Sequence, residues 1–173
     1  MAALALPAFQ TNTALSRDFE TRWERPAMSS AALTKPRELA FAIPSGGVAY
    51  KVVITTGSIP DWIRPTISGF INIQSLPENW DSYSGKRIDR DLIRQSLSVL
   101  EQIMETSSPA PSVVPLGNGG IQLEWHRKQQ DLEICFTPDD SAQFFYQDKN
   151  RGFEKEGYAS QIEDLLQLMR KIA

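Results

Sequence analysis

Two neighbouring segments of this chain alternate strictly between apolar and polar residues, and this pattern constrains the fold more than any other feature. Every second residue is apolar in Ile121–His126, and the alternation continues in Asp131–Phe136. A period of two predicts β-strands with one buried face and one face in contact with solvent. The intervening Arg127–Gln130 is short enough to connect them directly. The sequence therefore predicts an antiparallel hairpin that contributes to the core.

The register of this hairpin follows from the requirement that both apolar sets lie on one face. The two sets share a face only when paired residue numbers sum to an odd value, and the most centred register pairs Trp125 with Leu132. The same register places Glu124 directly opposite Glu133 on the polar face. Facing carboxylates repel each other by about 0.2–1 kcal/mol, so the acidic face requires an explanation.

Three explanations for the acidic face are open. Solvent can screen the repulsion, neighbouring cations can neutralise it, or the face can bind a divalent cation or a basic partner. The candidate cations are Arg127, Lys128 and Lys155. The candidate partner-binding residues are Glu124, Asp131 and Glu133.

The polar face also suggests two enzymatic alternatives. Glu124, Asp131, Glu133 and His126 are the residues that a metal-dependent hydrolase or nuclease would use here. The pattern departs from such nucleases, because His126 stands where they have Lys and Pro138-Asp139 follows the hairpin instead of preceding it. Cys135 and His126 lack a third group that would activate a thiolate. We therefore predict no catalytic residue, no metal ligand and no cofactor.

The remaining periodicity predicts an α+β fold, with an antiparallel β-meander of four C-terminal strands and helices packed on one face. The helices are expected over residues 89–105 and 160–172, with Asp89 as an N-cap and Ser160-x-x-Glu163 as a capping box. A shorter helix is expected to pass through Phe70. An N-terminal hairpin over residues 38–56, turning at Pro44–Gly47, completes the prediction.

Residues 1–36 mix Ala, Ser, Thr and Pro without a lasting period, which predicts a flexible or partner-dependent arm. Residues 37–173 are expected to form a single α+β domain. Within the arm, Phe19 and Trp23 are spaced as i and i+4. They are a candidate helical docking pair for a protein partner, or an aromatic pair that folds back on the domain.

The segment Leu76–Gly85 is predicted to be a polar loop that contains Trp80 and Tyr83. The two aromatic side chains either fill the core beneath the loop or form a surface platform, and the first alternative is favoured. Asp81 is expected to accept hydrogen bonds from backbone amides. Trp80, Asp81 and Tyr83 are therefore further candidate partner-binding residues.

Charge and cysteine content limit the classes of protein that are plausible. The net charge is −3, and residues 91–173 carry 13 acidic against 8 basic residues, which disfavours a general affinity for nucleic acid. One local basic cluster is a candidate nucleic-acid-binding site: Lys86, Arg87, Arg90 and Arg94.

A single cysteine excludes an internal disulfide and favours a reducing compartment. The opening residues lack the features of a secretory signal and no apolar run is long enough to span a membrane, so we expect a cytoplasmic protein without a membrane partner.

Two stretches, Asn79–Tyr83 (Asn-Trp-Asp-Ser-Tyr) and Gly119–Trp125 (Gly-Gly-Ile-Gln-Leu-Glu-Trp), resemble a widespread family of small uncharacterised bacterial proteins. The resemblance covers about Leu76 to Tyr158. Ser84 stands where that family usually has Gly. The resemblance implies a bacterial origin, on a mobile or defence-related element, without implying a reaction. The leading hypothesis is accordingly a non-catalytic protein-binding component of a bacterial multi-protein complex.

Overall fold

The structure is a computed structural model that describes residues 9–12, 37–42, 49–54 and 59–173. The chain divides into two compact units, Met1–Ile59 and Pro60–Ala173. This division differs from the predicted boundary at residue 36, because the N-terminal hairpin belongs to the first unit.

The described residues of the first unit form an antiparallel sheet of three strands, β1 (Phe9–Asn12), β2 (Arg37–Ala42) and β3 (Ala49–Ile54), in the order β1-β3-β2. The predicted hairpin between β2 and β3 is confirmed. Strand β1 lies within the segment that was predicted to be an arm. The candidate docking pair Phe19 and Trp23 lies outside the described residues.

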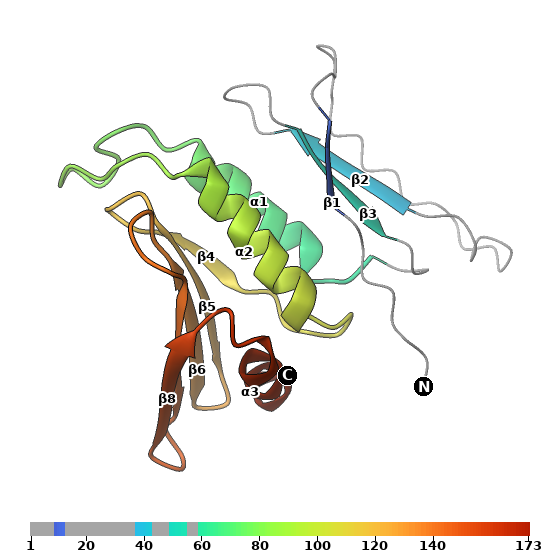
Figure 1. Ribbon diagram of the computed structural model, residues 1–173, viewed down its shortest axis with the longest axis vertical. Helices are drawn as coiled ribbons and strands as arrows, with labels where there is room; N and C mark the ends of the chain where they lie inside the picture. Colours follow the sequence, from blue (N-terminus) through green and yellow to red (C-terminus); the bar gives the residue numbers. More distant parts are fainter. Residues whose placement is uncertain (1–8, 13–36, 43–48, 55–58) are drawn as a thin grey trace, which may run out of the picture. The chain divides into compact units, whose positions relative to one another are not determined.

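The second unit is built on a five-stranded antiparallel meander in which every strand pairs with its neighbour in sequence (Figure 1). Its strands are β4 (Ser112–Pro115), β5 (Ile121–Arg127), β6 (Gln130–Phe136), β7 (Gln143–Asp148) and β8 (Phe153–Tyr158). The α+β meander is confirmed, but the prediction of four strands missed β4. That strand has only four residues and ends at a proline, so its pattern was too short to recognise.

The central hairpin has the predicted register. Trp125 pairs with Leu132 and Glu124 pairs with Glu133. Lys128 and Gln129 form the turn with φ values of 52° and 62°. Positive φ at both central positions is typical of the tight turns that match the twist of a two-stranded hairpin.

Three helices, α1 (Ile63–Gln74), α2 (Arg90–Ile103) and α3 (Ile162–Ile172), lie on one side of this sheet (Figure 1). The side chain of Asp89 accepts a hydrogen bond of 2.8 Å from the backbone of Asp91, which confirms the predicted N-cap. The capping box at Ser160 is wrong. Gln161 is the N-cap residue of α3 and makes no side-chain cap bond, because its Oε1 accepts from the backbone of Tyr158 instead.

The core fills the space between the helices and the inner face of the sheet. Trp125 is 2% exposed, and its Nε1 donates a hydrogen bond of 2.8 Å to the carbonyl of Pro109. The other large side chains that are fully buried are Tyr146, Phe70, Phe136, Ile93, Leu100, Ile103, Ile121, Leu123, Leu132, Ile134 and Leu165. The apolar halves of both alternating strands therefore face inward, as predicted.

Candidate functional site

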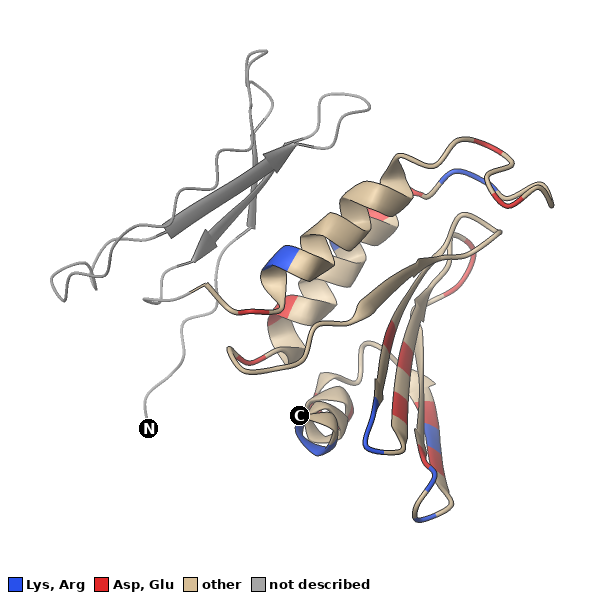
Figure 2. Cartoon of the chain, turned by 180° about the vertical axis from the view of Figure 1, so that it is seen from behind, with Lys and Arg blue, Asp and Glu red and all other residues tan. Residues whose placement is uncertain are grey.

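The side of the sheet that faces away from the helices is polar, and we call it the outer face. It is formed by Gln122, Glu124, His126, Asp131, Glu133, Cys135, Gln143, Phe145, Gln147, Glu154, Glu156 and Tyr158. Figure 2 shows its acidic residues spread over the strands, with basic residues gathered near the turns. The three predicted partner-binding acids, Glu124, Asp131 and Glu133, all lie on this face.

Gln122 connects the two facing carboxylates. Its Nε2 donates hydrogen bonds of 2.8 Å to Glu124 and 3.1 Å to Glu133, while its Oε1 accepts from the Cys135 thiol at 3.3 Å. One amide group thus bridges both acids without a cation. This arrangement was absent from the three explanations drawn from the sequence.

His126 extends this network to Asp131. Its Nδ1 lies 2.9 Å from Asp131 and its Nε2 lies 3.3 Å from Glu124, and Lys149 forms an ion pair with the second oxygen of Asp131. Of the cations predicted to neutralise the face, Lys128 bonds the carbonyl of Ala173 and Lys155 pairs with Asp164 at 2.8 Å. Lys149 was missed because it reaches Asp131 from the next hairpin turn.

The charges of this network shift two pKa values. Hydrogen bonds that the ring of His126 donates to Asp131, and then to Glu124, hold the pKa of His126 above its ordinary value of 6.5. Lys149, followed by His126, holds the pKa of Asp131 below its ordinary range. Because both ring nitrogens face carboxylates, the geometry favours the doubly protonated imidazolium.

His126 should give this protein a small pH-dependent stability. A raised folded-state pKa contributes stability that is complete below about pH 6.5 and is lost as pH rises through the folded pKa. We expect His126→Gln to remove this slope, with an effect below about 1 kcal/mol because the side chain is half exposed. Urea midpoints measured from about pH 5 to about pH 9 test this. Equal slopes in the two proteins would contradict it.

The geometry does not support Cys135 as a nucleophile. Burial raises the pKa of its thiol, and the negative charges of Glu133 and Glu124 raise it further. A nucleophilic cysteine needs the opposite shift, which a nearby cation or a helix N-terminus provides. The thiol instead acts as a hydrogen-bond donor to Gln122.

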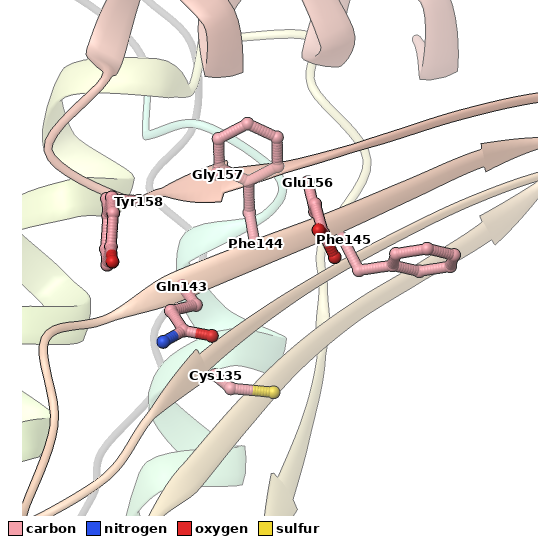
Figure 3. A pocket seen from close by; sticks show the side chains of 7 residues that line it. All are labelled: Cys135, Gln143, Phe144, Phe145, Glu156, Gly157 and Tyr158. Atoms are coloured by element: carbon pink, nitrogen blue, oxygen red, sulfur yellow. The ribbon is translucent and has the colours of Figure 1, made fainter.

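Two aromatic side chains that the sequence analysis missed stand on the outer face. Phe145 is 37% exposed and Tyr158 is 55% exposed. They border a hollow of about 410 Å³, which Cys135, Gln143 and Glu156 also line (Figure 3). The signal was present in the alternation of strand β7, which assigns Phe145 to the polar face while Phe144 and Tyr146 point inward.

The loop before α2 is ordered by its own side chains. Asp81 accepts hydrogen bonds of 2.8 Å from the backbone of Tyr83 and of Gly85, as predicted, and these bonds lower its pKa. Asn79, Ser82 and Ser84 all have positive φ. Ser84 has a φ of 71°, which lies in the left-handed region that favours glycine.

The predicted burial of both loop aromatics is wrong for Tyr83, which is 89% exposed at the loop tip. Trp80 is half-buried, and its Nε1 donates to the carbonyl of Lys86 at 3.2 Å. The network of bonds within the loop replaces the apolar anchor that was expected from Tyr83.

The segment between the Leu76–Gly85 loop and α2 forms hydrogen bonds with the turn that leads into β5. The backbone N–H of Lys86 donates to the carbonyl of Gly117 at 2.9 Å, and that of Asp89 donates to Gly119 at 3.1 Å. The loop is thus fixed against the turn that leads into β5.

The predicted basic cluster is spread over two elements. Lys86 and Arg87 are exposed in the loop, whereas Arg90 and Arg94 belong to the first turns of α2. Arg94 forms an ion pair with Asp91 at 3.0 Å. Its charge is partly offset, as is typical of a solvated helix face.

Among the described residues, no group of three His, Cys, Asp or Glu side chains is arranged to hold a metal ion. None of the helices in that part of the chain is long and apolar enough to cross a membrane. Comparisons with protein-family models, with curated proteins and with solved structures found no match to this chain. The resemblance to a bacterial family therefore stays a prediction.

Proposed function

We propose that this chain is a non-catalytic protein-binding component of a bacterial multi-protein complex and that it binds its partner through the outer face. The observation that carries the proposal is the placement of Phe145 and Tyr158, two exposed aromatic side chains, within a face that holds five carboxylates. No helix of the second unit covers this face (Figure 1). Aromatic anchors surrounded by polar groups are typical of protein interfaces.

The chemistry of the outer face supports binding over catalysis. Both nitrogens of His126 are engaged by carboxylates, and the Cys135 thiol is held in its protonated form by burial and neighbouring acids. Glu124 and Glu133 accept hydrogen bonds from one glutamine. These groups satisfy each other, whereas a general base or nucleophile requires a free, activated group.

The biological setting is part of the same proposal. The family resemblance supports a bacterial origin on a mobile or defence-related element, and the single cysteine supports a cytoplasmic location. The strongly acidic outer face supports a protein partner over nucleic acid, whose phosphates it would repel.

Replacing Glu133 with glutamine tests this function. The change relieves a like-charge contact with Glu124, so stability should hold or rise by less than about 1 kcal/mol. Binding of the partner should weaken by about 1.5–3 kcal/mol, the range for hydrogen bonds to a charged group. Urea unfolding and quantitative affinity capture from the native host measure the two effects on the same sample.

Glu163→Gln is the matched control, because it removes the same charge from an exposed position on α3. It should leave capture of the partner unchanged. A Glu133→Gln protein that captures the same partner as efficiently as wild type would refute binding through the outer face.

A further inference from the structure

The hollow on the outer face combines aromatic walls with an acceptor-rich lining. Figure 3 shows Tyr158 and Phe145 at opposite ends of the hollow, Glu156 beside Phe145, and the side chains of Gln143 on β7 and Cys135 on β6. Strand pairing explains this geometry. Gln143 lies opposite Tyr158, and Phe145 lies opposite Glu156, so two neighbouring outer-face positions on each of β7 and β8 form these walls of the hollow.

Glu156 is available to a ligand. Within residues 59–173, no side chain forms a hydrogen bond or ion pair with its carboxylate, and the residue is exposed. The neighbouring acid of the same strand face, Glu154, differs because it accepts a hydrogen bond of 2.8 Å from Gln147. The carboxylate of Glu156 is thus free to accept hydrogen bonds at the edge of the hollow.

The net negative charge around the hollow favours a cationic ligand. Glu124, Asp131, Glu133, Glu154 and Glu156 carry five negative charges on this face, against the positive charge of Lys149 and that of His126 when its ring is protonated. Opposite potentials steer a charged partner toward such a surface and disfavour a partner of the same sign. The charge of the outer face therefore disfavours an anionic ligand in the hollow.

Aromatic rings beside a carboxylate favour arginine among the cationic side chains. The guanidinium is planar, stacks on aromatic faces and offers a fork of donors to a carboxylate, whereas the lysine ammonium is a strongly hydrated point charge. The side-chain oxygen of Gln143 provides a second acceptor within the same hollow. These groups together match the recognition pattern of a guanidinium.

We propose that the hollow between Phe145 and Tyr158 binds an arginine side chain from a basic segment of the partner protein, with Glu156 accepting its hydrogen bonds. This inference rests on the proposed function and names the partner chemistry of the same face. The remaining carboxylates of the outer face attract the flanking basic residues. Phe145 and Tyr158 supply the apolar contact that anchors the segment.

The test uses the full chain, labelled for NMR, and two short synthetic peptides. One peptide carries a single Arg between Val and Thr residues, and the other carries citrulline, its uncharged isostere, at that position. We expect the Arg peptide to shift the backbone amide signals of residues 143–145 and 156–158. We expect the citrulline peptide to bind at least about fivefold more weakly, as the loss of a cation–π contact and a charged hydrogen bond at an exposed site implies.

Two variants and one control assign the contact. Glu156→Gln and Tyr158→Leu should each raise the Kd of the Arg peptide by about threefold or more, while Glu163→Gln should leave it unchanged. Equal affinities for the two peptides, or signal shifts confined to the Tyr83 loop or to α2, would overturn the inference. So would a Glu156→Gln protein with the wild-type Kd.

The two proposals fail separately. If partner capture depends on Glu133 while the Arg peptide does not bind the hollow, the protein-binding function holds and the arginine inference is rejected. If the peptide binds as expected but capture is indifferent to Glu133, the hollow binds arginine in a peptide, but binding of the partner protein through the outer face is rejected.

Discussion

Replacing Trp125 with alanine is expected to lower the free energy of unfolding by about 3–5 kcal/mol, the range for removing a buried large aromatic side chain. Trp125 is 2% exposed, so the change opens a cavity between the sheet and the helices. It also leaves the carbonyl of Pro109 without its hydrogen bond of 2.8 Å. Urea unfolding followed by circular dichroism measures the loss.

Tyr83→Ala provides the control for this experiment, because it also removes an aromatic ring, but from a side chain that is 89% exposed. Its effect should lie within about 0.5 kcal/mol of zero. A Trp125→Ala midpoint close to that of wild type would show that the face formed with Ile121 and Leu123 is not the core.

The second large effect is expected at Gly119, in the turn that leads into β5. Its φ of +88° is unfavourable for any residue with a side chain, and an added Cβ would lie 2.8 Å from the backbone oxygen of Arg87. The conformational cost is about 1–2 kcal/mol, and overpacking against backbone adds about 1–3 kcal/mol. Gly119→Ala should therefore destabilise the protein by at least about 2 kcal/mol in urea unfolding.

Gly152→Ala is the matched control for Gly119→Ala. Gly152 also has positive φ, at +60°, but a Cβ there would have nothing within 4 Å. Gly152→Ala should therefore lower the free energy of unfolding by the conformational cost alone. The difference in free energy of unfolding between the two variants measures the cost of the contact with the backbone oxygen of Arg87. Equal losses would show that the backbone of the segment before α2 yields to the added Cβ.

Local patterns were sufficient to predict much of the fold. The alternation around Trp125 restricted the register to pairings whose residue numbers sum to an odd value, and the most centred of these, which pairs Trp125 with Leu132, is the one observed. Strand β4 was missed because four residues that end at Pro115 carry too little periodicity. The N-cap at Ser160 was wrong because Gln161 bonds the end of β8, a contact that depends on tertiary geometry.

The candidate site was only partly predictable for the same reason. Strand register was enough to place Glu124 opposite Glu133, but the bridge made by Gln122 depends on the rotamer of a side chain on the same strand. Lys149 was missed because it reaches Asp131 across a separate hairpin. Alternation within β7 places Phe145 on the same face as Gln143 and Gln147, but its position opposite Glu133 and Glu156 required the strand pairing.

The ion pair between Lys155 and Asp164 has a consequence for how copies of this protein behave at high concentration. Strand β8 ends the meander, and an edge strand is a template for uncontrolled pairing and aggregation. A charged residue that points inward from the edge is one of the devices by which natural sheets prevent this, and Lys155 is such a residue. Two copies that paired antiparallel about Lys155 would also set Glu154 of each copy against Glu156 of the other, where like charges repel. The edge therefore discourages self-association while the aromatic side chains beside it stay accessible to a different chain.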